Sequence, residues 1–177
     1  MFLNAKKIAF LGLLLACTVL LVIFSGVFEF NTLFLLAGAS FCVGIAIRES
    51  GLQLGFGFLI GATILSLILA PNKFHCITFA AMGFYLFIYE FSWKKIGSAK
   101  RIYKRNTVFW IIKYAAFNVM YIPTILLLPH LIFQGKLNTA MVAAILLGGQ
   151  IALWFYDQAY RYFQRFIWGK IRISHFS

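Results

Sequence analysis

Acidic residues are scarce in this sequence. Glu29, Glu49, Glu90 and Asp157 are the only four among 177 residues, and there are only three histidines. General acid–base catalysis and metal-assisted hydrolysis depend on carboxylates and imidazoles that lie together. No pair of these residues recurs at metal-ligand spacing, and the sequence contains neither His-Glu-x-x-His nor Gly-x-Ser-x-Gly. We therefore expect a protein that is not an enzyme and that has no metal and no cofactor.

Cysteines are equally few. Cys17, Cys42 and Cys76 are an odd number, they lie in or beside apolar stretches, and no two of them are closely spaced. This pattern differs from the closely spaced cysteine pairs of zinc sites. We interpret the three cysteines as small apolar residues that pack between helices.

Charged residues of both signs make up only 11% of the chain, against about 25% in soluble domains, whereas 63% of the residues are apolar. A chain of this composition cannot bury its apolar residues in one water-soluble core. A membrane-spanning helix needs roughly 20 apolar residues, so six such helices use nearly the whole chain. The sequence predicts an all-α polytopic membrane protein, a single integral membrane domain over residues 1–177. Its six transmembrane helices are expected at residues 8–26, 31–47, 51–70, 74–91, 107–133 and 139–156.

The first apolar stretch has some features of a secretory signal. Lys6 and Lys7 precede it, and residues 14–17 read Leu-Leu-Ala-Cys, as at a lipoprotein cleavage site. The apolar stretch nevertheless continues to Phe24, which makes it long enough to span a membrane. We expect a retained first helix.

All 16 basic residues except Lys113, which lies inside the fifth apolar stretch, fall between or beside the stretches, although a net charge of +12 would also suit a nucleic-acid-binding protein. Only Lys73 and Lys136 follow the first, third and fifth stretches. Thirteen basic residues fall on the other side, and they are Lys6, Lys7, Arg48, Lys94, Lys95, Lys100, Arg101, Lys104, Arg105, Arg161, Arg165, Lys170 and Arg172. Because basic loops stay in the cytoplasm, both termini are predicted to be cytoplasmic. The expected location is the cell membrane, with the lipid bilayer and not nucleic acid as the partner.

Two basic segments also carry aromatic residues. Residues 92–106 and residues 160–176 alternate Lys and Arg with Trp, Tyr, Phe and Ile. Such segments favour the membrane interface, where aromatic rings and basic heads are both stable. We expect both to lie along the inner leaflet, and the first could also dock a partner.

Small residues are informative because helices in lipid associate by close backbone approach. In the third stretch, Gly51 and Gly55 share one helical face, and Gly57 and Gly61 share a nearly opposite one. This helix is therefore predicted to pack between neighbours on both sides. Gly12 and Ala16 form a similar ridge on the first helix, which either packs inside the protein or docks another membrane subunit.

Polar residues fall into two groups. Glu29, His75 and His130 are expected near the outer side, where a carboxylate and two imidazoles could bind a polar or cationic solute. Glu90, Lys113 and Asp157 are expected near the inner side, and Lys113 could form an ion pair with Glu90 or with Asp157. The alternative for the outer group is that all three residues lie in hydrated loops.

The architecture resembles a known transporter family. Six short apolar stretches in 177 residues, two cytoplasmic ends, a small-residue ridge at Gly12 and Ala16, and a basic loop between the fourth and fifth helices are similar to the S components of energy-coupling factor transporters. These proteins capture vitamins and other micronutrients. The resemblance implies an S-component-like bundle in a bacterial plasma membrane, a solute pocket beneath the first outer loop, and a coupling transmembrane protein with ATPases as partners. It also implies that Gly12 and Ala16 face the coupling subunit.

A second resemblance leads to another function. Residues 48–51 (Arg-Glu-Ser-Gly), residues 55–57 (Gly-Phe-Gly), Pro71 and residues 74–89 look like the middle of MreD, the rod-shape scaffold protein of cell-wall synthesis. That family usually carries an Asp after its glycine-rich helix, where residues 63–66 here read Thr-Ile-Leu-Ser. Two functions therefore stay open, a solute-binding transporter subunit and a noncatalytic scaffold subunit.

Overall fold

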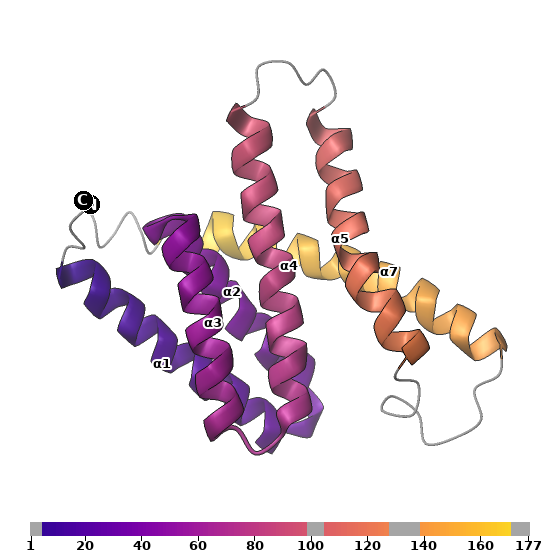
Figure 1. Cartoon of the computed structure of the whole chain (residues 1–177), viewed down its shortest axis with the longest axis horizontal. Helices are drawn as coiled ribbons and strands as arrows, with labels where there is room; N and C mark the ends of the chain where they lie inside the picture. Colours follow the sequence, from indigo (N-terminus) through magenta and orange to yellow (C-terminus); the bar gives the residue numbers. More distant parts are fainter. Residues whose placement is uncertain (1–4, 99–104, 128–138, 171–177) are drawn as a thin grey trace. The chain divides into compact units, whose positions relative to one another are not determined.

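The described part of the chain is all-α. The computed structural model describes residues 5–98, 105–127 and 139–170, and every long element in these ranges is a helix (Figure 1). Each predicted stretch coincides with one helix, although residues 128–133 of the fifth lie outside the described residues. The six helices are α1 (Ala5–Val27), α2 (Thr32–Ser50), α3 (Leu52–Leu69), α4 (Lys73–Ser98), α5 (Arg105–Leu127) and α7 (Thr139–Tyr162).

Four of these helices are long and apolar enough to cross a membrane. They are α1, α2, α3 and the Lys73–Ile96 part of α4. By length and composition, the chain therefore has the character of a multi-pass membrane protein. That α5 and α7 also cross, with both termini in the cytoplasm, stays a prediction.

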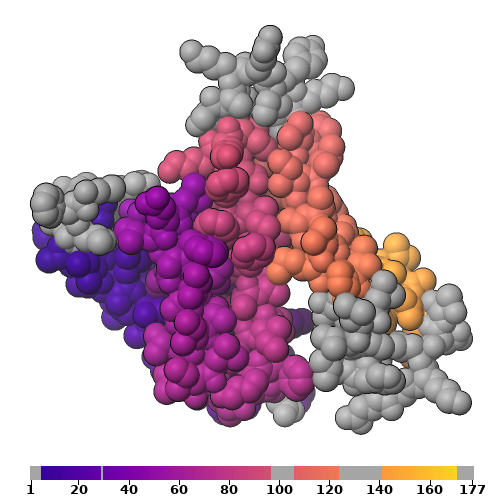
Figure 2. All heavy atoms as spheres, in the orientation of Figure 1, coloured from indigo at the N-terminus to yellow at the C-terminus, as the bar shows by residue number. Residues whose placement is uncertain are grey.

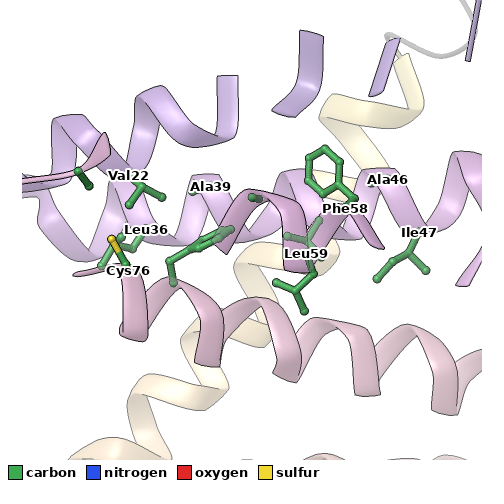
Figure 3. Packing of buried hydrophobic residues seen from close by; sticks show 12 residues of the cluster. Val22, Leu36, Ala39, Ala46, Ile47, Phe58, Leu59 and Cys76 are labelled. Atoms are coloured by element: carbon green, nitrogen blue, oxygen red, sulfur yellow. The ribbon is translucent and has the colours of Figure 1, made fainter. Parts of the chain in front are cut away.

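The helices group into two compact units, residues 1–105 and residues 106–177. In the first unit, α2 is the central helix, and it packs against α1, α3 and α4. Its residues 39–47 are all buried. Apolar side chains of α1, α2, α3 and α4 pack together into one core (Figure 3). The members of this core are Val22, Leu36, Ala39, Val43, Ala46, Ile47, Phe58, Leu59, Ala62, Ala70, Cys76 and Phe79.

A single glycine reverses the chain between α2 and α3. Gly51 has φ +92°, which side chains rarely tolerate, and its N–H donates to the Ile47 carbonyl over 2.9 Å. Gly51 therefore forms the turn itself and caps α3, and its carbonyl accepts the Gly55 N–H over 2.9 Å. That Gly51 and Gly55 share a packing face stays a prediction.

Gly55 brings the start of α3 close to the end of α2. A Cβ added at Gly55 would lie 2.7 Å from the Cα of Ile47, closer than real Cβ atoms approach. On α4, an added Cβ at Gly83 would lie 2.6 Å from Leu59 Cδ1 of α3. These two glycines set the spacing of α3 from its neighbours on either side.

The second predicted glycine face of α3 is open. No atom of the described chain lies within 4 Å of a Cβ added at Gly57 or Gly61. Large apolar side chains on the same face of α3, among them Ile60, Ile64 and Ile68, are exposed. In Figure 2, α3 (purple) forms part of the visible surface of the first unit. Such a surface suits lipid or another membrane helix.

Candidate functional site

In the first unit, His75 joins the end of α1 to the start of α4. Its Nδ1 lies 3.2 Å from Ser25 Oγ, and its Nε2 lies 3.3 Å from Asn72 Nδ2. Ser25 Oγ donates its own hydrogen to the Val22 carbonyl over 2.7 Å, so it accepts from Nδ1–H. The Asn72 amide then donates to Nε2. A neutral imidazole with the hydrogen on Nδ1 therefore satisfies every partner.

Asn72 is held in that orientation by the helix that follows it. Its Oδ1 accepts the backbone N–H of Phe74 over 3.0 Å, which is the geometry of a helix N-cap at the start of α4. Lys73 donates to the Leu67 and Ala70 carbonyls at the end of α3. The turn between α3 and α4 is thus fixed by its own side chains.

The structure locates one of the three residues predicted to form an outward solute site. His75 is described, and both of its ring nitrogens contact side chains of the same unit. Glu29 belongs to the short 3₁₀ helix η1 (Glu29–Asn31), but its side chain is not among those described. His130 lies outside the described residues. The grouping of the three stays a prediction.

At the opposite end of the first unit, Glu90 of α4 pairs with Arg48 of α2. Arg48 Nε lies 2.7 Å from Glu90 Oε1, and a terminal guanidinium nitrogen lies 2.6 Å from the same oxygen. The Glu90 carboxylate is buried, whereas Arg48 reaches the surface. This charge-assisted contact joins the C-terminal parts of α2 and α4.

In the second unit, Lys113 of α5 pairs with Asp157 of α7. Lys113 Nζ lies 2.8 Å from Asp157 Oδ2, and both side chains are only 2% exposed. Of the two partners that the sequence left open for Lys113, the structure has Asp157. Arg161, one helical turn further along α7, contacts the same oxygen over 3.2 Å. The Lys113 ammonium also lies 3.7 Å from the centre of the Trp110 ring, a cation–π contact.

Two further polar contacts join α5 and α7. Gln150 Nε2 donates to Asn118 Oδ1 over 2.7 Å, and the Tyr121 hydroxyl donates to the Ile145 carbonyl over 2.8 Å. Gly149 makes room for the Tyr121 ring, because any Cβ there would overlap it. Together with Lys113–Asp157, these contacts form a polar seam in which the residue number rises along α5 while it falls along α7. The two helices are therefore antiparallel, and the seam sets their register.

The chemistry of the polar seam is that of helix pairing. Each of its hydrogen bonds has its donor and its acceptor within the protein, and buried polar groups in membrane helices stabilise one another in this way. Asp157 Oδ1 is the one seam atom that is buried with no hydrogen-bond partner. In residues 5–98, 105–127 and 139–170, no three His, Cys, Asp or Glu side chains lie close enough together to hold a metal ion.

The small-residue ridge of α1 faces away from the core of the first unit. No atom of the described chain lies within 4 Å of a Cβ added at Gly12, and Ala16 is exposed. Thr18, Val19 and Val22 of the same helix are buried. One part of α1 therefore packs inside the unit while the ridge stays open.

Sequence reasoning did not identify two of the contacts that join helices in these units. The Ser25–His75–Asn72 group and the contact of Tyr121 with a backbone carbonyl link residues far apart in the chain. A signal existed for the seam, because Lys113 and Asn118 lie in the fifth apolar stretch, and Gln150 and Asp157 lie in or directly after the sixth. Two spans that follow each other in the chain are antiparallel when both cross the membrane.

Comparison of the chain with models of protein families, with curated proteins and with solved structures finds no match.

Proposed function

We propose that this protein is a noncatalytic membrane subunit that assembles with another membrane protein through the small-residue ridge of α1, Gly12 and Ala16. The observation that supports this function most directly is the open ridge. In lipid, helices associate where small residues let two backbones approach closely. A glycine with free space beside it, on a helix that buries Thr18, Val19, Val22 and Ser25 in its second half, leaves a surface of that kind uncovered by the described residues.

A scaffold role agrees best with the interior of the first unit. Twelve buried apolar residues fill the space between α1, α2, α3 and α4, and His75 at the start of α4 uses both ring nitrogens within the chain. A protein of this kind would act by holding partner helices in place.

A solute-binding role is the second candidate, and the position of the ridge favours it. The open small residues lie on the first helix, which is where the S components resembled by this sequence face their coupling subunit. In this function the protein would capture a micronutrient at its outer side and pass it on with a coupling protein and ATPases.

The test is co-purification of the full-length protein from its native membranes in mild detergent. Gly12→Leu and Ala16→Leu are expected to lose the partner while the isolated protein stays folded, because a Cβ added at Gly12 meets no neighbouring helix among the described residues. Gly57→Leu is the matched control, since it adds the same bulk to an open position on α3. ATPase subunits among the retained proteins would favour the transporter role, and other membrane proteins the scaffold role.

Two results would contradict the proposal. Aggregation of Gly12→Leu during purification would place the ridge inside the folded core. Loss of the partner with Gly57→Leu, but not with either α1 variant, would move the interface to α3.

A further inference from the structure

The helix that begins as α7 continues past Tyr162 and ends in a surface rich in both cations and apolar side chains. After Tyr162 the chain forms a π-helical segment, η2 (Phe163–Trp168), and two more helical residues follow. Six exposed residues make up this surface, which we call the α7–η2 surface. They are Arg161, Tyr162, Arg165, Phe166, Ile167 and Lys170.

The π-helical segment explains why these residues are exposed together. Its wider turn lets Gln164 point inward, where Nε2 donates to the Tyr160 hydroxyl over 3.2 Å, while the next three residues all lie on the surface. The rings of Tyr162 and Phe166 are in contact, with centroids 4.8 Å apart. The Arg165 guanidinium lies 5.7 Å from the centroid of Phe166. Cations and aromatic rings thus form one continuous patch.

The positive charge of this patch is not neutralised within the second unit. Asp157 is the only acidic residue in residues 106–177. Its Oδ2 already contacts Lys113 over 2.8 Å as well as Arg161 over 3.2 Å, so two cations share one carboxylate. Arg161 is 43% exposed and carries part of the excess charge to the surface. Arg165 and Lys170 add two more positive charges there.

We propose that the α7–η2 surface binds the headgroups of anionic phospholipids. The argument is charge complementarity combined with the exposed rings, because arginine binds phosphate oxygens through several N–H donors and aromatic side chains are stable at headgroup depth. A segment that is apolar and basic at once is the usual form of a helix that lies in the membrane interface. The apolar side chains insert between lipids, and the guanidinium groups contact phosphate.

The experiment is a lipid titration of the full-length protein in neutral detergent, with the melting temperature as the readout. Phosphatidylglycerol is expected to raise the melting temperature, because a ligand that binds the folded state stabilises it, and phosphatidylcholine is expected to have little effect. Arg165→Gln should shift the phosphatidylglycerol midpoint by about fivefold, the effect of one basic residue near an anionic surface. Arg165→Lys, which keeps the charge, should shift it much less.

Lys7→Gln is the matched control, because it removes one positive charge from an exposed position at the start of α1. Unchanged phosphatidylglycerol midpoints in Arg165→Gln, or equal shifts in Arg165→Gln and Lys7→Gln, would overturn the proposal. So would equal stabilisation by the two lipids. Stabilisation by soluble polyglutamate, without any by the lipid, would assign the surface to an acidic protein partner instead.

Discussion

At the scale of single residues, the glycines of α3 separate into those that the packing requires and those that it does not. Gly55 lies against the backbone of Ile47, which cannot move aside as the end of a flexible side chain can. Gly57, two residues later on the same helix, has open space around it. The same residue type therefore has opposite consequences at two nearly adjacent positions.

We expect Gly55→Ala to destabilise the protein and Gly57→Ala to leave it unchanged or more stable. An overpacked methyl group costs about 1 to 3 kcal/mol, whereas alanine in an unobstructed helix is favoured over glycine by roughly 1 kcal/mol. The measurement is thermal or denaturant unfolding of the two purified variants in the same detergent. Equal destabilisation by both would contradict the observed proximity of Gly55 to Ile47.

His75 is the residue for which a structural and a ligand-binding role can be separated. His75→Ala and Asn72→Ala should each cost about 1 kcal/mol, because the first removes the hydrogen bond to Ser25 that joins α1 to α4 and the second removes the N-cap of α4. The double variant should lose less stability than the sum of the two single variants, since both single variants remove the Asn72–His75 hydrogen bond. If the effects add and His75→Ala leaves the stability nearly unchanged, the imidazole has no structural role and could instead contact a solute.

At the scale of helices, α5 and α7 depend on each other for the burial of charge. Lys113 and Asp157 are both buried, and a buried charge without its partner is costly. The two partners differ in what remains when the other is removed. Asp157 would still contact Arg161, whereas Lys113 would lose the carboxylate that the structure places beside it.

This asymmetry predicts that Asp157→Leu is more harmful than Lys113→Met. The first leaves the Lys113 ammonium buried without its carboxylate, which we expect to cost about 3 to 5 kcal/mol, while the second leaves Asp157 paired with Arg161. The double variant Lys113→Met/Asp157→Leu should be more stable than Asp157→Leu alone. Unfolding midpoints of the three variants decide the matter, and a double variant no better than Asp157→Leu would show that the ion pair does not join the two helices.

The last helix is longer in the structure than the apolar stretch that predicted it. The sequence predicted a span over residues 139–156, which ends before the first charged residue. In the structure the helix includes Asp157 and Arg161 and continues to Lys170. Basic residues are good helix formers, so a helix can continue where its apolar stretch ends.

At the scale of the whole molecule, the placement of basic residues predicts the topology. Reporters fused after residues 28, 73 and 136 should lie outside the cell, and those after residues 49, 98 and 177 should lie inside, because basic connections remain in the cytoplasm. An activity-based pair of reporters, one active only outside and one only inside, measures this at each site. Two discordant sites would exclude six crossings.

The sequence by itself determined the all-α class and the positions of the six helices. The length of an apolar stretch and the charges that interrupt it are local properties, and backbone hydrogen bonds within a helix need no distant partner. This is why each expected stretch coincides with an observed helix, and why four of them meet the length and composition of a membrane span.

Only the tertiary structure decided which polar side chains pair and which glycines are essential. Glu90 and Asp157 were equal candidates for Lys113 in the sequence, yet Glu90 pairs with Arg48 and Asp157 with Lys113. Gly51 was expected to begin the third apolar stretch, and its φ of +92° shows that it also forms the turn between α2 and α3. A pairing depends on the distance between helices that are far apart in the chain, and a backbone turn depends on how two helices reverse against each other, so neither can be obtained from residue spacing within one stretch.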